Sequence, residues 1–156
     1  MMNKFKIMAA VDLSGYSDGT VRYSLWLARK LDAELLLVNV INQRDLDMVQ
    51  RAMIGYGSFS FPEYLADQVQ ERKKRMMEIF KMASPGTITC QYLVPQGIPY
   101  QELLEVIEQE KPTLLVVGTK GRTNIADVVV GSTARKMYRK SPIPMVSIPA
   151  GFRDFP

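Results

Sequence analysis

The chain has 156 residues, 47% of them hydrophobic and 23% charged, a composition typical of one globular domain spanning residues 1–156. No apolar run approaches the roughly 18 residues that cross a bilayer, so we expect no membrane-spanning segment. Histidine is absent and Cys90 is the only cysteine, which excludes Ser-His-Asp and Cys-His catalysis, an internal disulfide and a thiolate zinc site within one chain. With no export signal visible in its first residues, we expect a cytoplasmic protein.

Lysine and arginine outnumber aspartate and glutamate by 20 to 16, which gives a net charge of +4. The basic side chains are densest in residues 72–75 and 135–140. Neither run has the regular alternation of basic and aromatic residues that is typical of single-strand binders. We therefore interpret both runs as solvated helix faces and expect no nucleic-acid partner.

The first third of the chain predicts a strand, a helix and a second strand. Residues 5–11 form a continuous apolar run, which indicates a strand buried on both faces, and a polar loop begins at Asp12. Ser17 or Asp18 can cap the helix that follows. The second strand lies within residues 35–41. The apolar positions of the helix recur at helical spacing and are Val21, Leu25, Ala28 and Leu31.

The middle of the chain predicts an excursion above the sheet edge, a long helix and an edge strand. Residues 42–62 contain glycines and a proline among Met and aromatic residues, so we expect a long and partly helical connection. A helix over residues 63–83 ends at a Ser-Pro-Gly sequence, and residues 87–94 form the edge strand, where Cys90 is expected to be buried and inert. We expect core or lid packing, rather than a docking surface, for Met48, Met53, Tyr56, Phe59 and Phe61.

The last third predicts two further helices and two further strands. A helix over residues 99–109 precedes the most uniformly apolar strand, residues 113–118. A helix starting near Ser132 and a strand over 144–148 close the chain. Strands that alternate with helices imply parallel pairing, hence a three-layer α/β sandwich of about five strands. In such sheets ligands bind beyond the carboxyl ends of the strands, so the residues that follow strands are the candidate site.

One such segment carries a glycine motif. It reads Gly118-Thr119-Lys120-Gly121, nine residues from Arg122 to Val130, and then Gly131-Ser132-Thr133 at the expected helix start. Glycines let the backbone approach a ligand, and hydroxyls and free N–H groups at a helix start can bind phosphate oxygens. The alternative is a simple turn followed by a helix cap.

This spacing resembles the nucleotide-binding signature of the universal stress protein family. The similarity extends to the opening strand, the Asn39-Val40 strand end, the Pro95-Gln96-Gly97 loop and residues 141–146. It implies a Rossmann-like fold of the adenine nucleotide alpha hydrolase type with a five-stranded parallel sheet in the order 3-2-1-4-5. It also implies a stress-response or signalling module that binds ATP or AMP. The last strand, Pro144 to Pro149, is apolar, and family members commonly dimerise through it, so we expect a homodimer.

The family's contacts carry over to matching positions of this chain. The resemblance places Ala10, Val11 and Asp12 beside the adenine and ribose, and Val40 at the adenine edge. The carboxylate of Asp12 can accept from ribose hydroxyls, approach a phosphate-bound Mg²⁺, or cap the following turn. The family often has His where this chain has Asn39. The residues implied on the ribose and phosphate side are Gly118, Thr119, Gly121, Arg122, Gly131, Ser132 and Thr133.

Two other functions stay open at this point. Residues 14–18 resemble the pyrophosphate loop of adenylating ATP pyrophosphatases, although Tyr16 and Gly19 replace a glycine and a hydroxyl residue of that pattern. A nucleotide-free interaction scaffold is the third hypothesis. No catalytic base can be named, so we expect at most slow ATP hydrolysis rather than a dedicated enzyme.

Overall fold

The computed structural model describes residues 4–83, 85–120 and 130–152. Its centre is a parallel sheet of five strands in the order β4-β2-β1-β6-β7, which confirms the predicted order 3-2-1-4-5. A second, two-stranded parallel sheet continues beyond β2 and β4 and was not predicted. The strands of the large sheet are β1 (Lys6–Ala10), β2 (Glu34–Val38), β4 (Cys90–Leu93), β6 (Leu114–Gly118) and β7 (Met145–Ile148), and those of the small one are β3 (Ile41–Asn42) and β5 (Gln96–Gly97).

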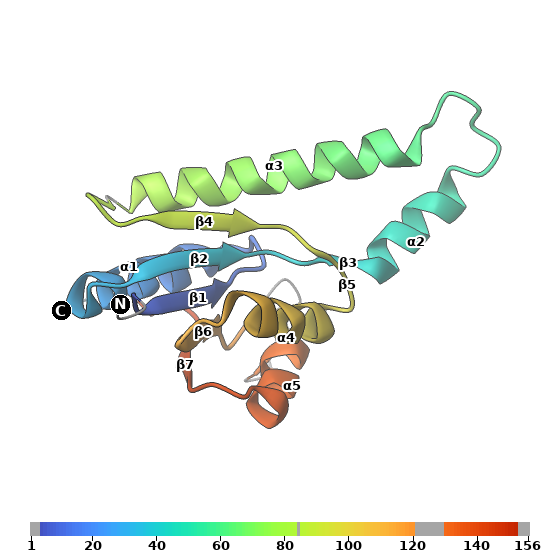
Figure 1. The fold of residues 1–156 in the computed structure, drawn as a ribbon. Coiled ribbons are helices and arrows are strands. Elements are labelled where there is room, and N and C mark those ends of the chain that lie inside the picture. The colour runs from blue at the N-terminus through green and yellow to red at the C-terminus, as the bar shows by residue number, and fades with distance from the viewer. Residues whose placement is uncertain (1–3, 84, 121–129, 153–156) are drawn as a thin grey trace.

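Helices cover both faces of the large sheet, as a three-layer sandwich requires (Figure 1). On one face lie α1 (Ser17–Leu31) and α3 (Phe61–Met82), and on the other lie α4 (Pro99–Glu110) and α5 (Ser132–Lys140). Successive residues of β1 point to opposite faces, and Ile7 and Met8 are both fully buried in the two separate cores. Burial on both faces is the reason that the central strands are continuous apolar runs.

The start of α1 differs from the sequence expectation. Tyr16, not Ser17 or Asp18, is the residue that precedes the helix, and it makes no side-chain capping bond. Ser17 is instead buried in the first turn, where its hydroxyl donates to the Asp12 carboxylate at 3.0 Å. At the other end, Leu31 is 44% exposed, so the predicted apolar face ends one turn early.

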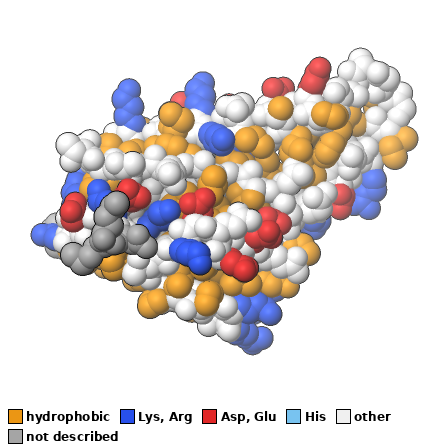
Figure 2. All heavy atoms as spheres, viewed as in Figure 1, with side chains coloured by type: hydrophobic (Ala, Val, Ile, Leu, Met, Phe, Trp, Pro, Cys, Tyr) orange, Lys and Arg blue, Asp and Glu red, His pale blue; other side chains and the backbone are white. Residues whose placement is uncertain are grey.

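An arm, defined here as residues 43–60, projects beyond the sheet and consists of α2 (Gln43–Ala52) and the loop to α3 (Figure 1). Part of the expected packing is present, because the Phe59 and Tyr64 rings lie 5.8 Å apart. The expectation is wrong for Met48 and Tyr56, which are 56% and 64% exposed because no layer of the sandwich reaches them. Hydrophobic side chains are accordingly visible at this end of the molecule (Figure 2).

The basic side chains of the run 135–140 are exposed, as expected. The ammonium groups of Lys136 and Lys140 lie 4.7 and 5.6 Å from the centre of the Tyr100 ring, so they pack α5 against α4. Within the ranges that the structure describes, no helix has both the length and the apolar composition needed to cross a membrane.

Candidate functional site

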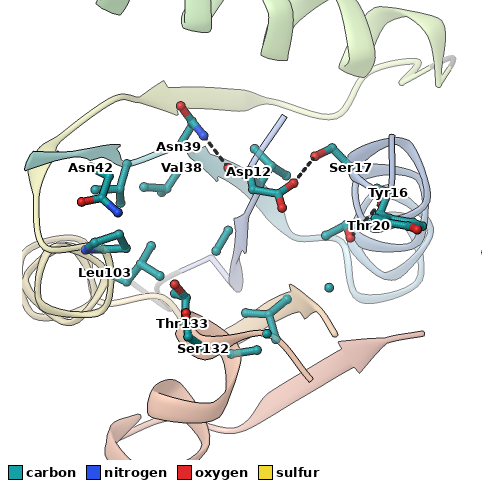
Figure 3. A pocket seen from close by; sticks show the side chains of 18 of the residues that line it. Asp12, Tyr16, Ser17, Thr20, Val38, Asn39, Asn42, Leu103, Ser132 and Thr133 are labelled. Atoms are coloured by element: carbon teal, nitrogen blue, oxygen red, sulfur yellow. Dashed lines mark hydrogen bonds between the residues drawn. The ribbon is translucent and has the colours of Figure 1, made fainter. Parts of the chain in front are cut away.

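A cavity of about 410 Å³ lies at the carboxyl ends of β1, β2 and β6 (Figure 3). This is the edge where open parallel sheets bind ligands. Its walls combine strand ends with the starts of α1, α2, α4 and α5 and with one residue of α3. Segments far apart in the sequence therefore meet in one hollow that is large enough for a small organic ligand.

One wall of the cavity is apolar. Ala10 and Val38 end the central strands, Val40 follows β2, and Pro99 and Leu103 come from the first turns of α4. Leu103 is 2% exposed and packs in the core, so this wall continues into the hydrophobic core. A wall of this kind suits a flat apolar ring such as a nucleobase.

The N-terminus of α5 forms the opposite wall, across the cavity from Asn39 (Figure 3). Gly131 has an extended conformation at the cap position, and within the described chain no side chain caps this helix. The Gly131 N–H donates to the Thr119 carbonyl at 2.6 Å, which ties the helix start to the end of β6. Ser132 and Thr133 line the cavity at the positive end of the helix dipole, where the first N–H groups of α5 are also located. Helix N-termini of this kind bind anions.

Of the glycine motif, the structure brings Gly118 together with Gly131, Ser132 and Thr133 at the cavity. Gly118 lines the cavity, and a Cβ there would lie 3.2 Å from the Thr20 hydroxyl, so the close contact between β6 and α1 favours glycine. Thr119 does not line the cavity; its backbone pairs with Ile148 and Gly131. Two predicted positions, Gly121 and Arg122, lie outside the described residues.

The side chain of Asp12 lines the cavity and also caps the turn that follows Asp12 in the chain. Its Oδ1 accepts from the Ser14 N–H and the Ser17 hydroxyl, each at 3.0 Å. Because both bonds end on Oδ1, Oδ2 is the oxygen suited to a ligand hydroxyl. In the part of the chain that the structure describes, no three Asp, Glu or Cys side chains converge as metal ligands. A Mg²⁺ ion at this site would therefore depend on phosphate oxygens.

In the loop that resembles a pyrophosphate loop, three backbone N–H groups are already paired with acceptors of the same segment. The Ser14 N–H donates to Asp12, the Tyr16 N–H to the Ser14 hydroxyl at 3.2 Å, and the Ser17 N–H to the Ser14 carbonyl at 3.1 Å. Backbone donors that are already paired cannot also surround a pyrophosphate. This geometry favours the glycine motif over the loop as the anion site.

Sequence reasoning missed the contribution of α3. Arg72 was assigned to a solvated face, but it lines the cavity and its Nη1 donates to Asn39 Oδ1 at 2.8 Å. One turn later, Arg75 Nη2 donates to the Leu13 carbonyl at 2.8 Å. The basic spacing in the sequence contains no signal for these contacts, because they depend on how α3 crosses the sheet.

Comparison with known proteins agrees with this architecture. The model of the universal stress protein family matches residues 4–149. Universal stress protein MJ0577 of Methanocaldococcus jannaschii is 22% identical over 151 residues, covering 92% of this chain and 93% of that protein. Its structure superposes with a TM-score of 0.77 at 21% identity, over 94% of this chain and 96% of that one.

Two further similar structures hold nucleotides. A universal stress protein in complex with cAMP has a TM-score of 0.63 at 20% identity, and the match covers 95% of this chain and 98% of that one. The Archaeoglobus fulgidus universal stress protein in complex with dAMP has a TM-score of 0.60 at 15% identity, over 94% and 98% of the two chains. Since the family model spans nearly the whole sequence, the chain belongs to the universal stress protein family.

Proposed function

We propose that the cavity binds an adenine nucleotide, ATP or AMP, and that the protein works as a nucleotide-dependent stress-response or signalling module. The observation that carries this proposal is one cavity with an apolar wall at the strand ends and the N-terminus of α5 opposite it. The nucleotides held by the two similar proteins support the same ligand class.

The walls assign a role to each part of the ligand. The adenine lies on the apolar wall, with its edge at the backbone of Val40. The ribose hydroxyls donate to Oδ2 of Asp12. The phosphates accept from the first N–H groups of α5 and from the hydroxyls of Ser132 and Thr133, where the helix dipole favours negative charge. If a Mg²⁺ ion binds, phosphate oxygens would hold it, and it would offset their negative charge.

We also propose a homodimer formed through β7, which lies at one edge of the sheet. The carbonyls of Pro144 and Ile148 accept from the N–H groups of Leu115 in β6 and of Thr119 just beyond it, at 3.0 Å each. Because alternate residues of a strand face the same neighbour, the backbone of Ser147 faces outward, and its side chain is exposed. This outward edge can pair with the same strand of a second copy.

Isothermal titration calorimetry of nucleotide-free protein tests the proposal. The ligands are ATP, AMP, adenosine and GTP, and mass spectrometry identifies any nucleotide released when freshly purified protein is denatured. We expect saturable binding of ATP and AMP, weaker binding of adenosine because its phosphates are missing, and weaker binding of GTP. Absence of ATP and AMP binding up to millimolar concentrations would refute the proposal and leave the scaffold hypothesis ahead.

A further inference from the structure

Asn39 is a buried polar junction between three elements at the rim of the cavity. It is 3% exposed. Its backbone N–H donates to the Leu93 carbonyl of β4 at 3.0 Å, and its Nδ2 donates to the Val11 carbonyl beyond β1 at 2.8 Å. Its Oδ1 accepts from Arg72 of α3 at 2.8 Å. Through its backbone and its side chain together, Asn39 therefore joins the ends of two strands to a helix on one face of the sheet.

Arg72 and the Val11 carbonyl together determine which way the Asn39 amide faces. A side-chain amide has a donor end and an acceptor end, whereas a guanidinium only donates. Arg72 can therefore pair only with Oδ1, which directs Nδ2 toward the Val11 carbonyl, itself an acceptor. Without Arg72, Oδ1 would lose this charged donor in a buried position, and a buried unpaired acceptor is costly.

The junction borders the part of the cavity assigned to the base. Val38 and Val40 flank Asn39 in the sequence, and both line the cavity. The Val11 N–H donates to the Val38 carbonyl at 2.9 Å, so the bonds of Asn39 and Val11 fix the spacing between the ends of β1 and β2. A change in the orientation of the Asn39 amide would therefore alter this spacing and move the wall assigned to the base.

We propose that Arg72 is a positioning residue for the nucleotide site, acting through Asn39 to hold the ends of β1 and β2 at the spacing that the base requires. This inference rests on the proposed function. It assigns to one cation of the basic run 72–75 a role in ligand affinity that no neighbouring lysine shares. Lys74 provides the matched control, because it lies on the same helix, is exposed and does not line the cavity.

The test is a double-mutant cycle on AMP affinity, measured by calorimetry with Arg72→Gln, Asn39→Ala, the double variant and Lys74→Gln. We expect Arg72→Gln to weaken AMP binding about tenfold, because part of the free energy of the Arg72–Asn39 hydrogen bond holds the base wall in its binding geometry. Lys74→Gln should stay within about twofold of the wild type, because its charge is screened by solvent. In the Asn39→Ala background, Arg72→Gln should cost less than about twofold more, because its partner is gone.

The possible outcomes distinguish failure of this inference from failure of the proposed function. Wild-type affinity for AMP in folded Arg72→Gln would overturn the inference alone, and an equal loss with and without Asn39 would show direct ligand contact and overturn the relay. Failure of the wild type to bind AMP would overturn the proposed function and this inference together. Arg72→Lys keeps the charge with a single ammonium donor, so we expect intermediate affinity; this variant decides the matter if circular dichroism shows that Arg72→Gln is unfolded.

Discussion

Replacing Ser132 by proline removes one backbone donor from the α5 terminus while preserving the helix. Ser132 is the first residue of α5, and the first N–H groups of a helix have no partner within it. Proline is favoured at this position, and the residue before it must be extended, which Gly131 already is with φ −65° and ψ 161°. We therefore expect the free energy of unfolding to change by less than about 1 kcal/mol.

The same substitution should strongly weaken phosphate binding. A hydrogen bond to a charged group contributes about 1.5–3 kcal/mol, so losing the Ser132 N–H should weaken AMP binding by about 10- to 150-fold. Adenosine affinity should be unchanged, because adenosine lacks the phosphate. The assay is calorimetry with both ligands, and Ser132→Ala is the control that removes the hydroxyl but keeps the N–H. Wild-type AMP affinity in folded Ser132→Pro would refute the phosphate assignment.

Three further predictions concern the dimer, the thiol and the small sheet. Ser147→Pro should convert a dimer to a monomer in light scattering, because it removes an outward-facing strand donor; a persistent dimer would contradict pairing through β7. Cys90 is half-buried rather than buried as expected, and this partial burial raises the pKa of its thiol from 9.0 to about 11. Near neutral pH iodoacetamide should therefore label folded protein about a hundredfold more slowly than urea-unfolded protein, and equal rates would contradict this. Gly97→Ala should lower the free energy of unfolding by about 1–3 kcal/mol in urea titrations, because Gly97 has φ +150° and a Cβ would lie 2.9 Å from Glu102 side-chain carbons. An unchanged urea midpoint would contradict this, since it would show that the backbone at residue 97 and the Glu102 side chain both adjust at no cost.

The strands of the sheet could be predicted because their burial is visible in the composition of each short segment. Strands buried on both faces must be apolar throughout, so β1, β2 and β6 stand out as continuous runs, and the order followed from the family resemblance. The small sheet could not be found this way. Its strands have two residues each, and the Ile41 N–H is paired by the Pro95 carbonyl at 2.8 Å, a backbone contact that no side-chain pattern encodes.

The site was predicted where it follows strand ends and missed where it comes from a distant helix. Asp12, Val40 and Gly131 could be placed because chain order puts them at the carboxyl edge of the sheet. The role of Arg72 depends on the length and crossing of α3, which helical spacing does not specify. The exposed side chain of Met48 was missed for the same reason, since an amphipathic pattern does not reveal whether a second layer covers it.

The most direct test of the central claim is an NMR titration of ¹⁵N-labelled protein with AMP, followed through the backbone amide signals. The account predicts saturable shifts at Val40 on the base wall and at Ser132 and Thr133 on the phosphate wall, with one common dissociation constant. Amides in the loop at the far end of the arm, such as that of Tyr56, do not line the cavity and should not shift. Absence of shifts at millimolar AMP, or saturable shifts confined to residues outside the cavity, would contradict it.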